Sequence, residues 1–284
     1  MSISTKIKQN LNKALKVANL RLDTLTAEKY ENKRISLLQS MGYFDRAVFP
    51  LISGMENFKF NTIAHLGKLY GNDLKVLMSG SGTVGQFNPD NNFYSSPDAE
   101  ILYLMVRSLA SKQILEIGSG NSTRIVRQAI ADGDLKVIHT AIDPAPRSDI
   151  KGLVDKMQLC RLEDVDVTHL VNQLAENDIL FIDSSHEVRC ANDVVKLFCN
   201  ILPRLSPGVV VHVHDIFLPF DYPLPFSTDY PGWGEQYMLQ LLMMAGNYEL
   251  LWPGYYLQKM RSAEYTTLQF LGEGRAQSFW FKIK

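Results

Sequence analysis

Four side chains that can exchange a proton follow two apolar segments of the sequence. Asp183 and His186 come after DILFID, and His214 and Asp215 come at the end of GVVVHVHDI. Carboxylates and imidazoles take up or deliver protons near neutral pH, and a hydroxyl group must lose its proton to act as a good nucleophile. We expect His186 to begin a helix, whose dipole would keep its imidazole neutral, although a structural role fits equally well. The pattern predicts a catalytic site with His186 or His214 as the base.

Two glycine-rich stretches are candidates for a ligand-binding turn. The first, Gly80–Gly85, has the spacing G-x-G-x-x-G, but QFNPDNN follows it. Pro89 and the neighbouring asparagines exclude the helix whose amides would face a pyrophosphate, so we interpret this stretch as a loop, with a possible second role as a lid. The second, EIGSGNST at 116–123, lies between an apolar strand and a helix. It is the better candidate, because glycines let the backbone amides of such a turn approach a ligand.

Acidic residues beside the second turn indicate the kind of ligand. Glu116 would repel a pyrophosphate but suits a ligand that carries an ammonium and a sulfonium group, and Thr123 replaces the third glycine of a dinucleotide site. Asp143 follows Gly120 by 23 residues, close to the separation at which an acidic residue reaches ribose hydroxyls. These features predict a nucleoside ligand without phosphates.

The elements that must position these residues alternate along the chain. Apolar strands are expected at 113–118, 136–143, 157–160, 178–183, 208–216, 248–252 and 278–283, and helices at 97–110, 121–132, 167–176, 187–204 and 234–246. Nearly continuous apolar strands that alternate with helices are typical of a parallel sheet buried on both faces. We therefore predict an α/β fold with a Rossmann-like, doubly wound, mostly parallel seven-stranded sheet. His212, which lies deeper in its strand than His214, is expected to have a structural role.

The front of the chain has a different pattern. Helices are expected at 2–20, 26–41 and 45–70, and a loop rich in Gly, Ser, Asn and Pro spans 79–98. The first helix is basic and amphipathic but has no Trp or Phe on its apolar face, so packing on its own domain or on a second subunit is favoured over membrane binding. We predict a helical N-terminal extension at 1–92, a second domain at 93–284, and a homo-oligomer formed through residues 1–60.

Composition excludes several classes of protein. The 29 Lys and Arg residues balance 30 Asp and Glu residues, so no basic surface for nucleic acid is expected. Three cysteines without a C-x-x-C pair indicate neither a disulfide framework nor a cysteine zinc site. The sequence lacks a long apolar run and a signal-peptide pattern, so we expect a cytoplasmic location without stable membrane insertion.

The motifs together resemble those of the class I S-adenosylmethionine-dependent methyltransferases over residues 93–284. The resemblance rests on E-x-G-x-G at 116–120, Asp143, Glu163-Asp164, DILFIDSSH and LSPGVVVHVHDIF. It implies S-adenosylmethionine as cofactor, and the order of motifs is most similar to small-molecule and glycan O-methyltransferases. The positions implied to bind the cofactor are Glu116, Gly118, Ser119, Gly120, Asn121, Ser122, Asp143, Glu163, Asp164 and Asp183. Tyr94 and Ser96 are expected near its methionine end.

The resemblance also implies an alternative to a histidine base. Related O-methyltransferases often hold magnesium with acidic residues at these strand ends, and Asp183 and Asp215 match two such ligands. His214 stands where another acidic ligand is expected, and magnesium prefers oxygen. We therefore prefer a histidine base over a magnesium site.

The segment 219–237 is rich in aromatic and acidic residues, with Gly232–Glu235 as a possible lid hinge, and suits a small-molecule or glycan hydroxyl acceptor. The expected activity is O-methylation of that acceptor. Three alternatives stay open: an N-methyltransferase on the same fold, an NAD(P)-dependent oxidoreductase that uses Gly118 to Asp143, and a methyltransferase-like module without catalysis.

Overall fold

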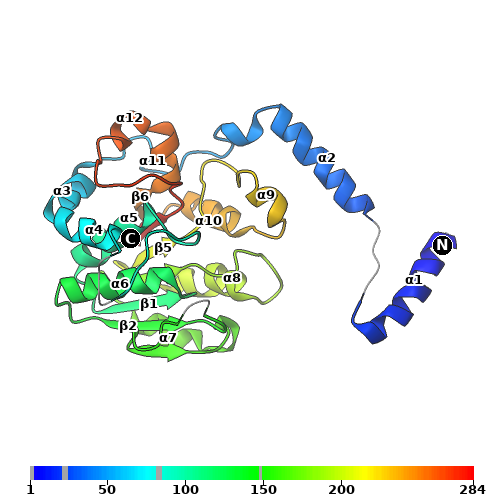
Figure 1. Ribbon diagram of the computed structural model, residues 1–284, viewed down its shortest axis with the longest axis horizontal. Helices are drawn as coiled ribbons and strands as arrows, with labels where there is room; N and C mark the ends of the chain where they lie inside the picture. The colour runs from blue at the N-terminus through cyan, green and yellow to red at the C-terminus, as the bar shows by residue number, and fades with distance from the viewer. Residues whose placement is uncertain (1–2, 21–24, 81–84, 147–148) are drawn as a thin grey trace. The chain divides into compact units, whose positions relative to one another are not determined.

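The computed structural model describes residues 3–20, 25–80, 85–146 and 149–284 (Figure 1). Its centre is a seven-stranded sheet in the order β3-β2-β1-β4-β5-β7-β6. The strands are β1 (Gln113–Ile117), β2 (Ile138–Ile142), β3 (Lys156–Gln158), β4 (Ile179–Ile182), β5 (Val210–Val213), β6 (Tyr248–Pro253) and β7 (Phe279–Ile283). Strands β1 to β5 pair in parallel, whereas β7 is antiparallel to both β5 and β6. The predicted Rossmann-like, mostly parallel α/β sheet is confirmed.

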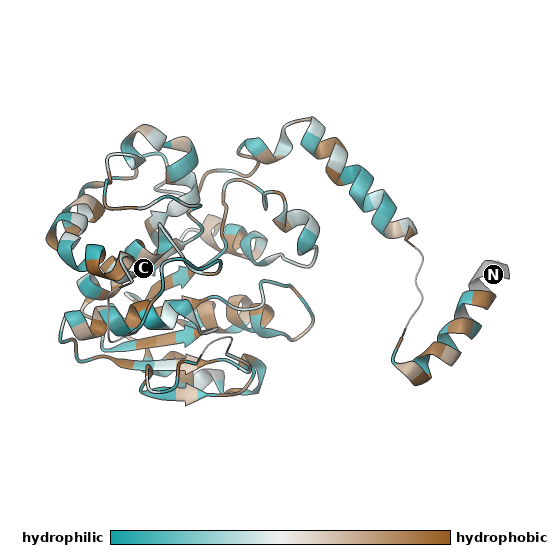
Figure 2. Ribbon diagram, in the orientation of Figure 1, coloured by the Kyte–Doolittle hydropathy of each residue, from teal (hydrophilic) through white to brown (hydrophobic). Residues whose placement is uncertain are grey.

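The sheet is buried at the centre because most side chains of its inner strands are apolar. Every residue of β4 and β5 is buried, and β1 carries a brown, apolar stretch in the hydropathy colouring of Figure 2. The connecting segments carry α5 (Asp98–Leu109), α6 (Asn121–Asp132), α7 (Val167–Gln173), α8 (Asp193–Lys196), α9 (Phe226–Asp229), α10 (Glu235–Met244), α11 (Gly254–Met260) and α12 (Ser262–Tyr265). This is the arrangement expected when crossover helices cover a parallel sheet.

One expected helix begins later than the sequence predicts. The helix expected at 187–204 starts only at Asp193, where the side chain of Asn192 accepts a hydrogen bond from the Val195 N–H. It then continues as a π-helical turn, Leu197–Ile201, and a 3₁₀ turn, Leu202–Arg204. Residues 184–192 form an irregular segment, so His186 does not lie at a helix start.

The chain forms two compact units, Met1–Arg46 and Ala47–Lys284. The expected boundary between residues 92 and 93 therefore lies inside the second unit. The helix expected at 45–70 is replaced by a loop followed by α3 (Asn61–Leu69) and α4 (Gly71–Met78). Several apolar side chains between residues 47 and 92 lie in the same core as the sheet, at 3% exposure or less: Ile52, Met55, Ile63, Leu74, Leu77 and Phe87.

The unit Met1–Arg46 contains α1 (Ile3–Leu15) and α2 (Thr26–Ser40). Both helices have large apolar side chains that are about half exposed or more. These are Ile7 and Leu11 in α1, and Tyr30 and Leu37 in α2. Exposed apolar surface of this kind is typical of an association site.

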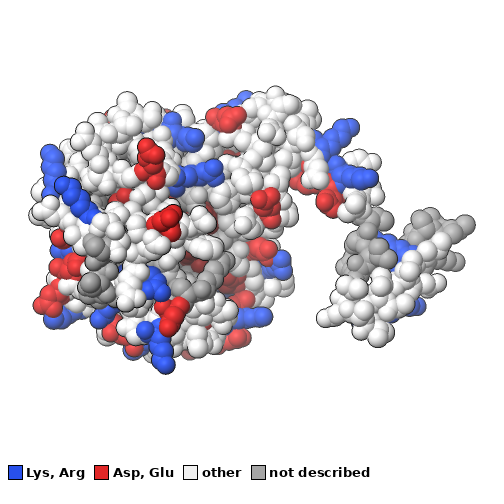
Figure 3. Space-filling view, in the orientation of Figure 1, with Lys and Arg blue, Asp and Glu red and all other residues white. Residues whose placement is uncertain are grey.

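The surface of the second unit has mixed charge. On the face shown in Figure 3, acidic and basic side chains are interspersed over this unit. Among the residues that the structure describes, no helix is both long and apolar enough to cross a membrane.

We propose that residues 1–46 associate with a second copy of the chain. Removal of these residues should lower the molar mass measured by light scattering, because their exposed apolar side chains are lost. The unfolding transition of the remaining unit should stay unchanged, because its core lies within Ala47–Lys284. In the full chain, Leu37→Lys should shift the mass in the same direction. The same number of chains per particle for all three proteins would contradict this prediction.

Candidate functional site

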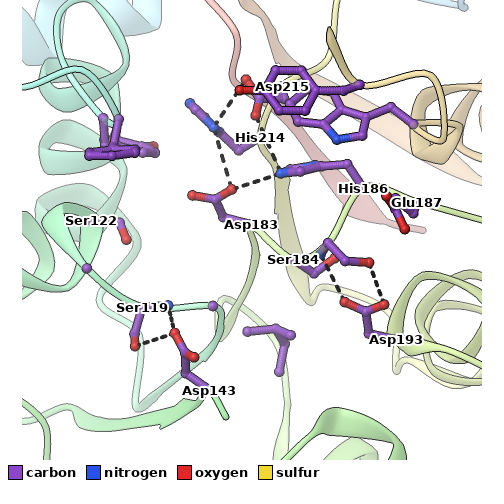
Figure 4. Close-up of a pocket in the computed structure, with 18 of the residues that line it drawn as sticks. Ser119, Ser122, Asp143, Asp183, Ser184, His186, Glu187, Asp193, His214 and Asp215 are labelled. Atoms are coloured by element: carbon purple, nitrogen blue, oxygen red, sulfur yellow. Dashed lines mark hydrogen bonds and ion pairs between the residues drawn. The ribbon is translucent and has the colours of Figure 1, made fainter. Parts of the chain in front are cut away.

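A cavity of about 1160 Å³ lies at the carboxyl ends of the parallel strands, where open α/β sheets place their ligands (Figure 4). It is lined by most of the residues that the sequence predicts as site residues. These are Gly118, Ser119, Gly120, Asn121, Ser122, Asp143, Glu163, Asp183, His186, His214 and Asp215. Glu116 and Asp164 are predicted but do not line the cavity.

The glycine turn after β1 is shaped by a close backbone contact. Gly118 has φ +81°, and a Cβ at this position would collide with the carbonyl oxygen of Asp183. Only glycine fits here, because a side chain would force the ends of β1 and β4 apart. At Gly120 an added Cβ would meet no atom within 4 Å, and its N–H donates to Thr123 Oγ1 at 3.0 Å. Thr123 thus caps α6 where a dinucleotide site would have its third glycine.

Glu116 has a structural role instead of facing the ligand. Its carboxylate is fully buried and accepts hydrogen bonds from Ser122 Oγ at 2.7 Å, Thr123 Oγ1 at 2.9 Å and His139 Nε2 at 2.9 Å. The expectation that it lies beside the ligand's ammonium group is corrected, because these three donors, from α6 and β2, turn the carboxylate away from the cavity. His139 was missed by the sequence analysis, although a histidine in the apolar run KVIHTAID was a signal.

Asp143 lies at the carboxyl end of β2 and is held in place by the glycine turn. Its Oδ2 accepts hydrogen bonds from both the N–H and the Oγ of Ser119 at 2.8 Å, and its Oδ1 accepts one from the Ala145 N–H at 2.8 Å. A carboxylate has about four acceptor sites, so Asp143 Oδ1, which accepts one hydrogen bond, can accept a second. The residue is therefore positioned to receive hydroxyl donors from a ligand in the cavity.

Asp183, His186, His214 and Asp215, named here the Asp–His cluster, converge at the ends of β4 and β5 (Figure 4). His186 Nε2 lies 3.3 Å from Asp183 Oδ1 and 3.4 Å from Asp215 Oδ2. His214 Nδ1 lies 3.8 Å from Asp183 Oδ1 and 3.7 Å from Asp215 Oδ1. His186 and Asp215 have φ values of +60° and +56°, which are uncommon for residues other than glycine and cluster at functional sites. The structure thus brings together all four predicted catalytic side chains.

Each histidine also contacts a third, deeper carboxylate. His186 Nδ1 donates to Glu235 Oε2 at 2.9 Å, and His214 Nε2 lies 3.5 Å from Asp98 Oδ2. Glu235 is fully buried and Asp98 is 3% exposed. Asp98 is not among the residues predicted from the sequence, and Glu235 is predicted only as part of a possible hinge. The available signal was an acidic residue in the first turn of two largely apolar helices, α5 and α10.

The carboxylates decide the charge of both imidazoles. Burial by itself lowers the pKa of His186, but hydrogen bonds to Asp183 and Glu235 and the charge of Asp215 outweigh it and raise this pKa well above its usual value. Burial also lowers the pKa of His214, and the charges of Asp215 and Asp183 likewise raise it well above the usual value. The prediction of a neutral His186 at a helix N-terminus is therefore wrong.

His212 is fully buried, and its Nε2 lies 3.4 Å from the Tyr94 hydroxyl. Burial and the charge of His214 lower its pKa, which agrees with the structural role expected for it. Tyr94 lines the cavity, and its ring stacks on His214 with centroids 4.6 Å apart. Ser96 does not line the cavity, and its hydroxyl donates to Glu100 at 2.6 Å.

The aromatic segment after β5 forms one wall of the cavity. Trp233 pairs with Glu187 in an isolated β-bridge, and the N–H of Gly234 donates to the His186 carbonyl oxygen at 2.9 Å. The ring of Trp233 lies between those of His186 and Tyr230, with centroid distances of 4.4 and 4.6 Å. These contacts fix Gly232–Glu235, the possible hinge, to the loop after β4. Of the first glycine stretch, residues 81–84 lie outside the described residues.

Comparison with known proteins gives a family match for part of the chain. Residues 115–216, from β1 to just beyond β5, match the model of a family described as a methyltransferase domain. No curated protein matches the chain. The matched residues therefore correspond to a methyltransferase domain, as the resemblance in the sequence implies, and the sheet order agrees with the predicted fold.

Several solved structures are similar at low sequence identity. An O-methyltransferase from Bacillus cereus in complex with SAH is 15% identical, with 88% of this chain and 97% of that chain covered and a TM-score of 0.42. SAH-bound PaMTH1 from Podospora anserina is 16% identical, with 84% and 99% covered and a TM-score of 0.44. The O-methyltransferase TomG from Streptomyces achromogenes, in complex with SAM, is 14% identical, with 92% and 99% covered and a TM-score of 0.39.

The Glu116 network should be important for stability. Glu116→Ala leaves the buried donors of Ser122, Thr123 and His139 without their acceptor, so we expect a loss of about 3–5 kcal/mol of unfolding free energy in denaturant titration. Asp134→Ala is the control, because it removes an exposed carboxylate that forms an ion pair with Lys136. An equal loss of unfolding free energy in the two variants would show that the buried network contributes no more to stability than an exposed ion pair.

Proposed function

We propose that the chain is an S-adenosylmethionine-dependent methyltransferase that methylates a hydroxyl group of a small molecule or a glycan precursor. One observation carries this proposal: a single cavity is lined by the glycine turn, by Asp143 and by the Asp–His cluster. A nucleoside-binding region and a group of proton-exchanging side chains thus face the same space. That arrangement suits group transfer to an acceptor that must lose a proton.

The residues present fit this cofactor. Asp143 Oδ1 keeps a free lone pair for a ribose hydroxyl, and Gly118 allows the turn to lie close against the end of β4. Leu162 and Glu163 line the cavity on the side of β3 and suit the adenine ring. The four carboxylates around the two imidazoles leave this end of the cavity with net negative charge even when both imidazoles are protonated. Such a field stabilises a positively charged sulfonium group, a role that the sequence analysis had assigned to Glu116.

S-adenosylmethionine, when bound, supplies an electrophilic methyl group. In the reaction the sulfur–carbon bond breaks, an oxygen–carbon bond to the acceptor forms, and the acceptor's proton leaves to the protein. The Asp–His cluster is the group in the cavity that can receive this proton, with the carboxylates of Asp183 and Asp215 nearest to the imidazoles. The chain otherwise contributes alignment of acceptor and cofactor, which can supply much of the acceleration.

The far wall of the cavity suggests the acceptor's chemistry. Phe226, Tyr230 and Trp233 present aromatic groups there, and Asp229 and Gln277 add polar side chains. Aromatic and polar groups on one wall suit a ring that carries several hydroxyls. This supports a polyhydroxylated small molecule or a glycan precursor.

Asp143→Asn should weaken cofactor binding more than it slows turnover. Loss of the charged acceptor for ribose hydroxyls affects the ground and transition states alike, so KM for the cofactor should rise with kcat nearly unchanged. Calorimetry with S-adenosylhomocysteine should show about 10- to 100-fold weaker binding. Asp134→Asn, at the exposed Lys136 pair, is the matched control. If Asp143→Asn binds S-adenosylhomocysteine as tightly as the parent, Asp143 does not bind the cofactor. Tight NAD(H) binding by the parent would favour an oxidoreductase.

The histidines of the Asp–His cluster should matter for the chemical step. With labelled S-adenosylmethionine and a panel of hydroxyl compounds, His186→Ala and His214→Ala should lower kcat by about 10²–10⁴-fold, with S-adenosylhomocysteine affinity nearly unchanged. His169→Ala, which removes an exposed imidazole outside the cavity, should keep full activity. Full activity in both cluster variants would exclude a histidine as the base. If activity also stays undiminished in a strong chelator, the acceptor needs no deprotonation here, as expected for N-methylation.

A further inference from the structure

Three side chains of the Asp–His cluster point donor atoms at one small space. Asp183, His186 and Asp215 each offer one ligand atom, and these atoms lie within 4.8 Å of one another. We propose that they bind a divalent transition-metal ion, with His186 as a nitrogen ligand. The role of this ion in catalysis rests on the proposed function, but its binding does not.

The separations of the donor atoms fit a metal ion of this kind. His186 Nε2 lies 3.3 Å from Asp183 Oδ1 and 3.4 Å from Asp215 Oδ2. Nitrogen and oxygen ligands about 2.0–2.2 Å from zinc lie about 3.3–3.5 Å from each other in tetrahedral geometry. The two separations that involve His186 match this geometry, and the carboxylate oxygens of Asp183 and Asp215 lie within 4.8 Å of each other.

Glu235 provides the second, independent observation. It is fully buried, lies in α10, and accepts the Nδ1–H of His186 at 2.9 Å. Histidines that bind metals almost always donate their other ring N–H to a carboxylate, carbonyl or water, which fixes the tautomer and directs the remaining nitrogen at the ion. Here that remaining nitrogen, Nε2, is the one that faces Asp183 and Asp215 (Figure 4).

His214 repeats the arrangement on the other side of the two carboxylates. Its Nδ1 lies 3.8 Å from Asp183 and 3.7 Å from Asp215, while its Nε2 faces Asp98 at 3.5 Å. Asp98 is itself held in place, because its carboxylate accepts hydrogen bonds from the N–H groups of Gln277 and Ser278. His214 Nδ1 thus lies near both carboxylates and offers a further nitrogen beside the three donor atoms.

The donor set decides which ions fit. Magnesium and calcium prefer oxygen ligands, whereas imidazole suits zinc, iron, nickel and copper. A set of two carboxylates with one or two imidazoles therefore favours a first-row transition metal. Such an ion supplies a Lewis acid beside the acceptor's hydroxyl group.

The test is a metal titration of untagged, full-length protein from which metal has been removed with a chelator. Calorimetry should show one cobalt(II) or zinc(II) ion bound per chain, at least about tenfold more tightly than magnesium. Cobalt(II) should also develop visible absorption bands of a protein-bound ion. Neither measurement needs an acceptor or an active enzyme.

Three variants identify the ligands. His186→Ala should weaken cobalt(II) binding by at least about tenfold. Glu235→Gln keeps the histidine but weakens the hydrogen bond to its Nδ1–H, and should weaken cobalt(II) binding by about 10- to 100-fold. His169→Ala, which removes an exposed histidine outside the cavity, should bind cobalt(II) like the parent. Thermal unfolding of each variant reports whether it is folded.

Two results would overturn the proposal. One is a parent protein that binds no transition metal at one ion per chain, or that binds magnesium equally well. The other is a folded His186→Ala protein whose cobalt(II) affinity equals that of His169→Ala. If His186→Ala does not fold, the parent is loaded with copper(II) and studied by pulsed electron paramagnetic resonance. A coordinated imidazole gives nitrogen modulation in this measurement, and the absence of that modulation overturns the proposal. Titration of metal-free protein with S-adenosylhomocysteine tests the proposed function separately.

Discussion

The contact between Gly118 and the backbone of Asp183 connects the two halves of the site. Four neighbouring strand ends are joined by hydrogen bonds from Gly118 N–H to Ile142, from Asp183 N–H to Ile117 and from His214 N–H to Ile182. These bonds place the glycine turn, Asp143 and the Asp–His cluster on one edge of the sheet. Because a side chain at Gly118 would break this alignment, the geometry of the whole cavity depends on a single residue without a Cβ.

Buried charge is the second organising feature. Glu116 and Glu235 are both fully buried, and each is stabilised by polar partners: Glu116 by two hydroxyls and His139, and Glu235 by His186. A buried carboxylate without such partners would be costly. The two glutamates nevertheless serve different purposes, because Glu116 lies behind the glycine turn whereas Glu235 orients a side chain that faces the cavity.

The aromatic segment and the N-terminal part of the second unit complete the cavity from outside the parallel sheet. Trp233 and Gly234 attach the segment after β5 to the loop that carries His186, and Asp98 reaches His214 from α5. The parallel sheet thus supplies a row of strand ends, as in many α/β proteins. The segment after β5 and helix α5 add the aromatic rings and the Asp98 carboxylate that distinguish this site.

The sequence by itself predicted the order of strands and helices, the glycine turn, Asp143 and the four members of the Asp–His cluster. It could do so because apolar periodicity and turn residues act over a few neighbours, and because parallel strands align their carboxyl ends. The tertiary structure alone decided the side-chain partners: Glu116 turned toward His139, and His186 toward Glu235, 49 residues away along the chain. It also decided that residues 47–92 belong to the core of the second unit. Such contacts depend on which segments pack together, and no local pattern contains that information.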